Sequence, residues 1–258
     1  LRGESAAKPG ENIFAYKRER MFAYPPLEPE NAPRGEIGIP RVLNMYENYP
    51  FWATFFRDLG FRVILSPFST RAVYELGMES IPSESECYPA KLAHGHAQWL
   101  IDRGVKTIFH PCVFYEHQEV PGAQNHYNCP IVVSYPENIK NNVEGVTDGS
   151  VRYLRPFLAF TSEKIAADRL AQFCRELGGK VDGEAVTDGS VRYLHPFLAF
   201  TNEKVAADRL AQFCKETWNI PERETRRAVH LAWKEQQKAK ADVRAAGAKA
   251  LADMEKNG

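Results

Sequence analysis

Hydrophobic positions in the first half of the chain alternate between short apolar runs and helical repeats. Residues 36–43 (EIGIPRVL) and 61–66 (FRVILS) are short apolar runs typical of buried strands. Between them, residues 45–60 carry apolar side chains at helical spacing, and Gly60 suits the position after a helix end. A strand, a helix and a second strand within about 30 residues form a βαβ unit, which predicts parallel strands.

The same alternation continues to about residue 140. Residues 70–80 and 87–104 predict two more helices, and residues 105–112 and 129–136 predict two more strands. We therefore expect an α/β fold over residues 35–145, with a doubly wound, mostly parallel sheet of the Rossmann-like or flavodoxin-like type. A helical C-terminal region is expected to follow it.

The two ends of the chain have patterns of their own. Residues 1–34 place aromatic side chains among Arg and Lys before a Pro-rich stretch, which predicts an N-terminal arm and connector. Residues 221–258 predict one long helix with a narrow apolar stripe. Because the chain starts at Leu1 and the helical pattern stops abruptly at Gly258, we expect a piece of a longer protein, truncated in this helix.

An internal repeat lies between these regions. Residues 146–176 recur as residues 186–216, at an offset of 40, and only four of the 31 positions differ. Each copy predicts one short apolar segment and one helix, so residues 146–220 are expected to form a duplicated strand–helix region. Repeats that build solenoids drift further and occur in longer runs, so two nearly identical copies indicate a recent tandem duplication or an assembly artefact.

Composition excludes several classes of protein. The 258 residues carry 33 Lys and Arg against 33 Asp and Glu, and this balance argues against a nucleic-acid binder, which needs a basic surplus. No apolar run approaches the roughly 20 residues that a membrane-spanning helix needs. Five cysteines are too few and too irregular for a secreted disulfide scaffold, which predicts a reducing, cytoplasmic compartment.

Three cysteines outside the repeats are the main candidates for chemistry. Cys87 begins the 87–104 helix, where the helix N-terminus favours a thiolate, and Cys112 ends the 105–112 strand. Cys129 reaches the same crevice only if the long loop at 113–128 folds back over it. Thiolates suit an iron–sulfur cluster, or zinc together with His126. Unligated, buried thiols are the third alternative, and the absence of a Cys-x-x-Cys pair leaves all three open.

Polar residues near these cysteines form a candidate pocket. Lys91 lies one turn after Cys87 and can hold an anionic group, whereas His94 equally suits a core histidine with satisfied ring nitrogens. Arg41 and Asn44 follow the first predicted strand, where ligands of such sheets bind. No GxGxxG or Walker A motif is present, so nucleotide binding has no support. The candidate pocket comprises Glu84, Ser85, Lys91, His94, His126, Arg41 and Asn44.

Several strings together resemble one family. They are IPRVLNMYENYPFW at 39–52, SIPSESECYPAKLAHGH at 80–96, HPCVFYE and NHYNCPIVVSYPE. They resemble the activase-related region of large 2-hydroxyacyl-CoA dehydratase activators, which is itself similar to the dehydratase subunits. The resemblance implies that Cys87, Cys112 and Cys129 match family cysteines and hold a [4Fe-4S] cluster or a related iron–sulfur cluster with one iron left open.

The resemblance also implies a function and partners. The chain would be a cluster-binding domain in ATP-driven, low-potential electron transfer linked to 2-hydroxyacyl-CoA dehydration. Its partners would be an ATP-binding activator module and the remaining dehydratase-like region, in the same longer chain or a separate subunit, together with acyl-CoA. It would be at most part of a lyase-associated system and inactive alone, with no catalytic residue assigned. The competing hypothesis is a non-catalytic scaffold or regulatory fragment, with unligated cysteines or a zinc site.

Overall fold

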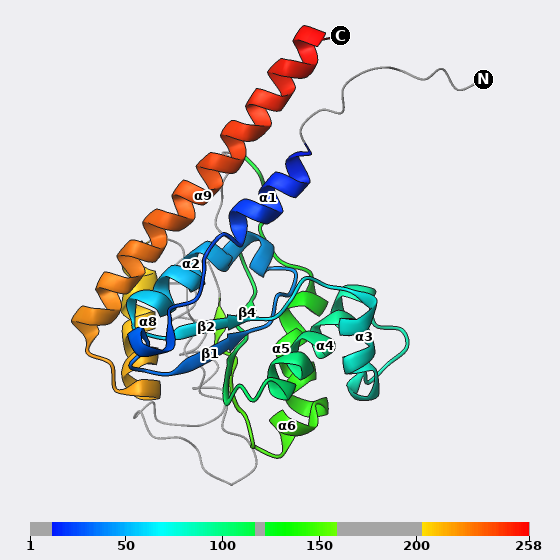
Figure 1. The fold of residues 1–258 in the computed structure, drawn as a ribbon, viewed down its shortest axis with the longest axis vertical. Helices are drawn as coiled ribbons and strands as arrows, with labels where there is room; N and C mark the ends of the chain where they lie inside the picture. Colours follow the sequence, from blue (N-terminus) through cyan, green and yellow to red (C-terminus); the bar gives the residue numbers. More distant parts are fainter. Residues whose placement is uncertain (1–11, 117–121, 159–202, 258) are drawn as a thin grey trace.

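The computed structural model describes residues 12–116, 122–158 and 203–257. Helices and short strands alternate along the chain (Figure 1). The helices are α1 (Ile13–Met21), η1 (Pro29–Asn31), α2 (Met45–Asp58), α3 (Arg71–Gly77), η2 (Met78–Ser80), α4 (Tyr88–Asp102), α5 (Pro130–Asn142), α6 (Glu144–Thr147), α8 (Glu203–Trp218) and α9 (Glu222–Asn257). The strands are β1 (Glu36–Ile39), β2 (Arg62–Leu65), β3 (Thr107–Phe109), β4 (Cys112–Val113), β5 (Arg152–Leu154) and β6 (Phe157–Leu158).

The main sheet has four strands in the order β2-β1-β3-β5, all parallel. Strands β4 and β6 form a second, two-stranded parallel sheet. The order of the first three strands is the one found in flavodoxin-like sheets, which place β1 between β2 and β3. The expected α/β fold with a mostly parallel sheet is confirmed, and so is the helical C-terminal region.

The prediction of a strand at residues 129–136 is wrong, because this segment begins helix α5. Cys129 is the N-cap residue of α5, and Pro130 occupies the first turn, where its missing N–H costs nothing. Val132, Tyr135 and Ile139 are buried at a spacing of three to four residues, as one face of a helix requires. The β-branched residues suggested a strand, but tertiary burial of this face favours the helix. The fourth strand of the main sheet is instead β5.

Helices cover both faces of the main sheet. On one face, the aromatic side chains of α2 pack with residues of α8 and α9, and this cluster contains Trp52, Phe55, Phe56, Phe213 and Val229. On the other face, Leu100 of α4 packs with Val105, Ile108 and Val151. The sheet is therefore doubly wound, with apolar strands buried between two helical layers.

Glycines are required at two kinds of position in this fold: after helix ends and where two helices cross. Gly60 and Gly104 have φ values of +79° and +78°, as expected for glycines that follow helix ends. Gly77 and Gly95 instead lie where α3 crosses α4. A Cβ atom on Gly95 would lie 1.7 Å from the carbonyl oxygen of Val73, so the two helices meet backbone to backbone.

The described part of the repeat contributes to both sheets and to the core. The first copy supplies β5 and β6, and the second copy supplies α8. Leu210 and Cys214 of α8 are fully buried, so Cys214 is a small residue of the core. The first-copy helix predicted near residues 162–174 and the second-copy apolar segment near 193–200 lie outside the described residues.

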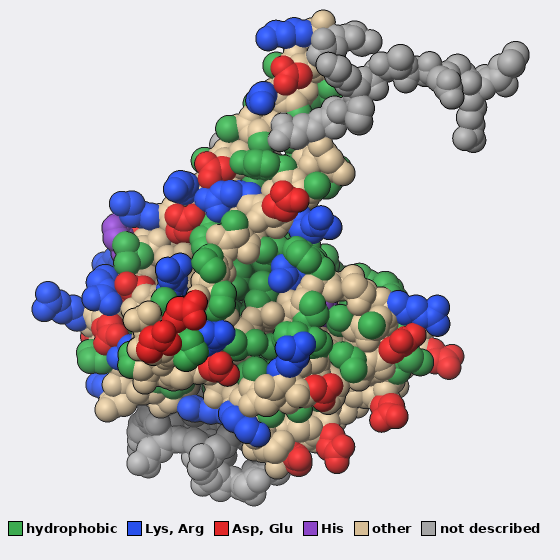
Figure 2. Space-filling view, viewed as in Figure 1, with side chains coloured by type: hydrophobic (Ala, Val, Ile, Leu, Met, Phe, Trp, Pro, Cys, Tyr) green, Lys and Arg blue, Asp and Glu red, His purple; other side chains and the backbone are tan. Residues whose placement is uncertain are grey.

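The N-terminal arm lies along α9, the longest described helix (Figure 1). Arg20 of α1 binds Asp242 and Glu235 of α9, at 2.7 and 3.0 Å. Arg34 of the connector holds Glu224 through two hydrogen bonds of 2.6 and 3.0 Å. Acidic and basic side chains are interspersed over the visible face (Figure 2). Among the described helices, α9 included, none combines the length and apolarity that crossing a membrane requires.

Candidate functional site

Two of the three candidate cysteines occupy equivalent positions on adjacent helices. Cys87 is the N-cap residue of α4 and Cys129 is the N-cap residue of α5, each with extended or near-extended backbone and each exposed. Neither sulfur caps its helix through a hydrogen bond. Both thiols therefore lie at helix N-termini, where the helix dipole places partial positive charge.

Tyr135 lies on α5, where this helix passes the N-terminus of α4. Helices α4 and α5 pack against each other, and the Tyr135 side chain on α5 is 2% exposed. Its hydroxyl is buried and makes no hydrogen bond of good geometry within the described chain. Burial raises the pKa of Tyr135, and Cys87, Cys129 and Glu86 raise it further, so both thiols lie within electrostatic reach of the hydroxyl.

Cys112 lies beside the same helix but is closed to solvent. It begins β4, which packs on α5, and its side chain is 1% exposed. Burial raises the pKa of the Cys112 thiol to about 12, Glu137 raises it further, and Arg155 opposes the shift. Glu137 of α5 and Arg155 form an ion pair of 2.8 Å. Cys112 is therefore a neutral thiol at physiological pH in the absence of a metal.

The three cysteines thus lie on or beside α5 without forming a complete set of ligands. Cys87 and Cys129 both raise the pKa of Tyr135, and Cys112 lies on the strand that packs against the same helix. Over residues 12–116, 122–158 and 203–257, no group of three or more His, Cys, Asp or Glu side chains is arranged to hold a metal ion. The donor chemistry fits an iron–sulfur cluster, whose usual ligands are cysteine thiolates.

The loop before α4 is tied down by its own polar groups. The Lys91 ammonium donates to the carbonyl of Glu84 at 2.7 Å, and the Ser85 hydroxyl pairs with Ser83 at 2.8 Å. Neither Glu84 nor Ser85 caps α4, because Cys87 is the N-cap residue. Glu84, Ser85 and Lys91 therefore fix the loop that carries Cys87.

Glu86, in the same loop, connects it to α5. The Asn138 amide donates to Glu86 at 2.8 Å, while the second carboxylate oxygen is buried without a partner in the described chain. Burial raises the pKa of Glu86, and Lys91 opposes this shift. Glu86, Asn138 and Tyr135 were not predicted as site residues. Because the sequence pattern predicts a strand at residues 129–136, it provides no reason to place this side of a helix near Cys87.

His94 is a core histidine. It is 1% exposed, and its Nδ1 atom pairs with the Ser80 hydroxyl at 2.9 Å. His96 is equally buried and pairs with Ser66 and Ser69, both at 2.9 Å. Burial lowers the pKa of each imidazole to about 4. His94 is therefore a neutral, hydrogen-bonded part of the interior.

His126 lies in the loop between β4 and α5. Its Nε2 atom pairs with the carbonyl of Ala123 at 2.9 Å, and its ring packs edge-on against Tyr115 at 5.6 Å. A bridge between Tyr115 and Tyr127 closes this part of the loop. The ring is thus engaged within its own loop, and no metal-binding group of described residues includes it.

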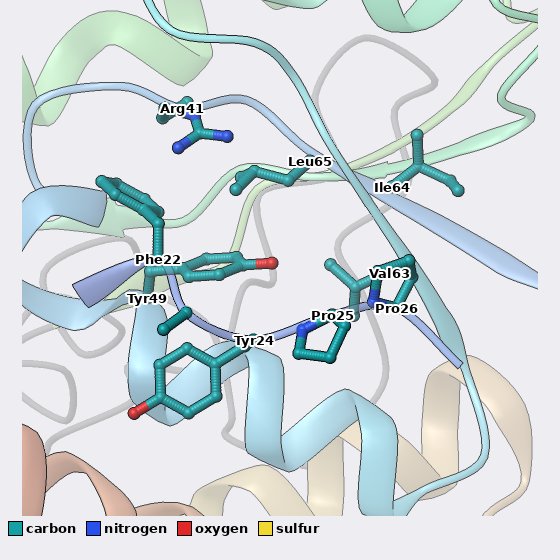
Figure 3. A pocket seen from close by; sticks show the side chains of 10 residues that line it. Phe22, Tyr24, Pro25, Pro26, Arg41, Tyr49, Val63, Ile64 and Leu65 are labelled. Atoms are coloured by element: carbon teal, nitrogen blue, oxygen red, sulfur yellow. The ribbon is translucent and has the colours of Figure 1, made fainter. Parts of the chain in front are cut away.

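Arg41 and Asn44 follow β1 at the carboxyl end of the sheet. Asn44 is the N-cap residue of α2 and is 6% exposed, with a side-chain oxygen that has no partner in the described chain. Arg41 lines an open cavity of about 620 Å³ with apolar walls (Figure 3). The sequence placed Arg41 and Asn44 after the first strand, where sheet ligands bind, and their role in binding stays a prediction. The walls supplied by the N-terminal connector were not foreseen, because nothing in its local pattern indicates where it docks.

Comparison with known protein families gives one match, in two stretches. Residues 36–188 and 183–258 match the CoA enzyme activase uncharacterised domain (DUF2229). Each stretch contains one copy of the internal repeat. Searches of curated proteins and of solved structures found no significant match. Since the two stretches together cover most of the sequence, the chain belongs to the CoA enzyme activase domain family DUF2229.

Proposed function

We propose that this chain is the iron–sulfur-binding domain of an acyl-CoA dehydratase activase-related protein, with Cys87, Cys112 and Cys129 as ligands. The observation that carries the proposal is that two exposed thiols, each at a helix N-terminus, both raise the pKa of the buried Tyr135 hydroxyl. Membership of the activase domain family supports the broader assignment.

The surroundings of Cys87 and Cys129 suit a negatively charged centre. Each thiol lies at the positive end of a helix, and neither helix has a hydrogen bond from its N-cap side chain. Because its pKa is raised, Tyr135 keeps its proton at neutral pH and can donate it to a sulfur. Hydrogen bonds to cluster sulfurs tune the reduction potential, so Tyr135 is expected to be a positioning residue.

Cys112 couples binding to the loss of a proton. Its thiol is buried and protonated at neutral pH, and a metal ligand must be a thiolate. Arg155, which lowers the pKa of Cys112, would stabilise the thiolate form. We therefore expect loading to release a proton from Cys112 and to draw β4 and the two helix N-termini together.

When bound, the cluster would supply one-electron transfer at low potential and an iron position open to a small oxygen ligand. We propose that ATP hydrolysis in an activator module drives the electron, in the same longer chain or a separate subunit. The remaining dehydratase-like region and acyl-CoA would complete the system. Free thiols at Cys87 and Cys129 accord with a reducing, cytoplasmic environment.

Anaerobic reconstitution tests this function. The purified chain is incubated with ferrous iron and sulfide, and bound iron, sulfide and zinc are measured together with the visible spectrum. We expect about four iron and four sulfide per chain with a broad visible absorption band, as for a [4Fe-4S] cluster. We expect most of the bound iron and sulfide to be lost in each of three separate variants: Cys87→Ser, Cys112→Ser and Cys129→Ser. Cys214→Ala removes an equally buried thiol that lies in the core cluster and should leave the loading intact.

Two results would contradict the proposal. If the chain retains zinc in place of iron, and the three cysteine variants lose that zinc, the site is a zinc site. No specific metal in the wild-type chain would favour a non-catalytic scaffold, an alternative supported by the lack of a preformed ligand group among the described residues.

A further inference from the structure

The cavity at Arg41 lies at the carboxyl end of the main sheet and shares none of its lining residues with the cysteine site. Its volume of about 620 Å³ is in the range of small-molecule sites. The walls come from three parts of the chain: the connector after α1, helix α2 and strand β2. They comprise Phe22, Ala23, Tyr24, Pro25, Pro26, Tyr49, Val63, Ile64 and Leu65, together with Arg41.

Arg41 is held in one position by two aromatic rings and by hydrogen bonds to Ser66. Its guanidinium carbon lies 4.3 Å from the Phe22 ring centre and 3.9 Å from the Phe68 ring centre, and the two rings stand at 88° to each other. The Nε atom donates to the carbonyl of Ser66 at 2.9 Å, and the backbone N–H donates to the Ser66 hydroxyl at 2.7 Å. The Arg41 side chain is therefore fixed by the hydrogen bond of its Nε atom and by its contacts with the Phe22 and Phe68 rings.

One terminal nitrogen atom of this guanidinium has no hydrogen-bond partner in the described chain. The Nη1 atom is buried without a hydrogen-bond partner, and no carboxylate of the described residues pairs with Arg41. Leaving a buried cationic donor unpaired is costly, so the arrangement is favoured when an anion supplies the missing acceptors. Figure 3 shows the guanidinium and the Tyr49 hydroxyl on either side of the Leu65 side chain in this view.

We propose that this cavity binds a small monocarboxylate with an apolar body. The carboxylate would accept hydrogen bonds from Arg41, in the planar geometry that a guanidinium favours, and from the Tyr49 hydroxyl. The apolar part would lie against the connector prolines, Val63 and Leu65. Among the described lining residues Arg41 is the one charged side chain, which matches a single negative charge better than a phosphate dianion. This inference stands whether or not the cysteines bind a cluster.

Binding of hexanoate by the full 258-residue chain tests the proposal, with hexanamide and inorganic phosphate as comparison probes. A ligand-observed NMR titration measures each dissociation constant. We expect saturable binding of hexanoate and at least about tenfold weaker binding of both comparison probes, because a charged hydrogen-bonded pair is lost or mismatched. Equal binding of hexanamide, preferential binding of phosphate, or no binding of hexanoate would each overturn the proposal.

Variants locate the binding. Arg41→Gln is expected to weaken hexanoate binding about tenfold or more, whereas Arg71→Gln removes an exposed arginine of α3 and should change nothing. Leu65→Trp fills the cavity without altering the cation and should also abolish binding, which keeps the test valid if Arg41→Gln fails to fold. Unchanged affinity in a folded Arg41→Gln protein or in a folded Leu65→Trp protein would refute the assignment.

Discussion

The side-chain amide of Gln236 in α9 is inserted into the backbone hydrogen bonding of α2 at Phe51. Its oxygen accepts from the Phe51 N–H at 3.0 Å, and its nitrogen donates to the carbonyl of Glu47 at 2.5 Å. Phe51 and Glu47 are four residues apart, so this donor and acceptor would pair with each other in an uninterrupted helix. Pro50, the residue before Phe51 in α2, has no backbone N–H and so cannot donate a helical hydrogen bond. Gln236 therefore links the two helices where the helical hydrogen bonding is interrupted.

Replacing Gln236 tests this link. Gln236 is 7% exposed, and Gln236→Leu removes both hydrogen bonds by which it bridges Phe51 and Glu47. We expect a loss of about 2–4 kcal/mol in the free energy of unfolding, measured by urea denaturation with tryptophan fluorescence. Gln212→Leu removes an exposed amide of α8 paired with Glu216 and should cost little. Equal stability of the two variants would contradict the structural role given to Gln236.

Alkylation rates should divide the described cysteines into two pairs. Cys87 and Cys129 are exposed, whereas Cys112 and Cys214 are buried and burial raises the pKa of each to about 12. Under anaerobic, metal-free conditions, iodoacetamide should modify the first pair at least about a hundredfold faster, because the thiolate is the reactive form. Peptide mass spectrometry follows each site over time. Rapid modification of Cys112 would show that β4 opens readily and would contradict its burial.

The buried histidines predict a loss of stability in mild acid. Burial lowers the pKa of His94 and His96 to about 4 and that of His110 to about 3, from 6.5 in an unfolded chain. Below pH 6.5 the unfolded chain binds protons that the folded protein does not, so the free energy of unfolding decreases as the pH falls toward 4. Each group contributes up to about 1.4 kcal/mol per pH unit in this window.

His94→Asn checks the origin of this dependence. An asparagine can keep the hydrogen bond to Ser80 but does not titrate. We expect the slope of unfolding free energy against pH between 6 and 4 to fall by about 1 kcal/mol per unit. His126→Asn, in an outer loop, serves as the control and should leave the slope unchanged. An unchanged slope in His94→Asn would show that this imidazole takes up its proton in the folded state.

Two glycine substitutions should have opposite effects. Gly95→Ala forces a Cβ against the carbonyl of Val73 at the α3–α4 crossing and is expected to destabilise the protein by about 2 kcal/mol or more. Gly247→Ala in α9 meets no atom within 4 Å and should stabilise the helix by about 0.5–1 kcal/mol. Thermal unfolding of both variants measures the difference. A tolerated Gly95→Ala would mean that the two helices do not approach as closely as described.

Local pattern was sufficient for most of the α/β elements. The strands at β1, β2 and β3, the helices α2, α3, α4 and α9, and the glycines after α2 and α4 lie where periodicity and turn residues predict them. The local pattern gave the wrong prediction at residues 129–136, where β-branched side chains and a proline fit either a strand or a helix N-terminus. The decision there depended on which side chains the rest of the molecule buries.

The sequence by itself determined the alternation of strands and helices, the helix-initiating position of Cys87 and the polar edge that contains Arg41, because these depend on neighbours within a few residues. Only the tertiary structure decided that Cys87 and Cys129 both influence Tyr135, that Cys112 is buried beside α5, and that the connector lines the Arg41 cavity. These relationships join residues far apart in the chain. They arise from packing that buries the apolar faces of separate elements together, which no local pattern encodes.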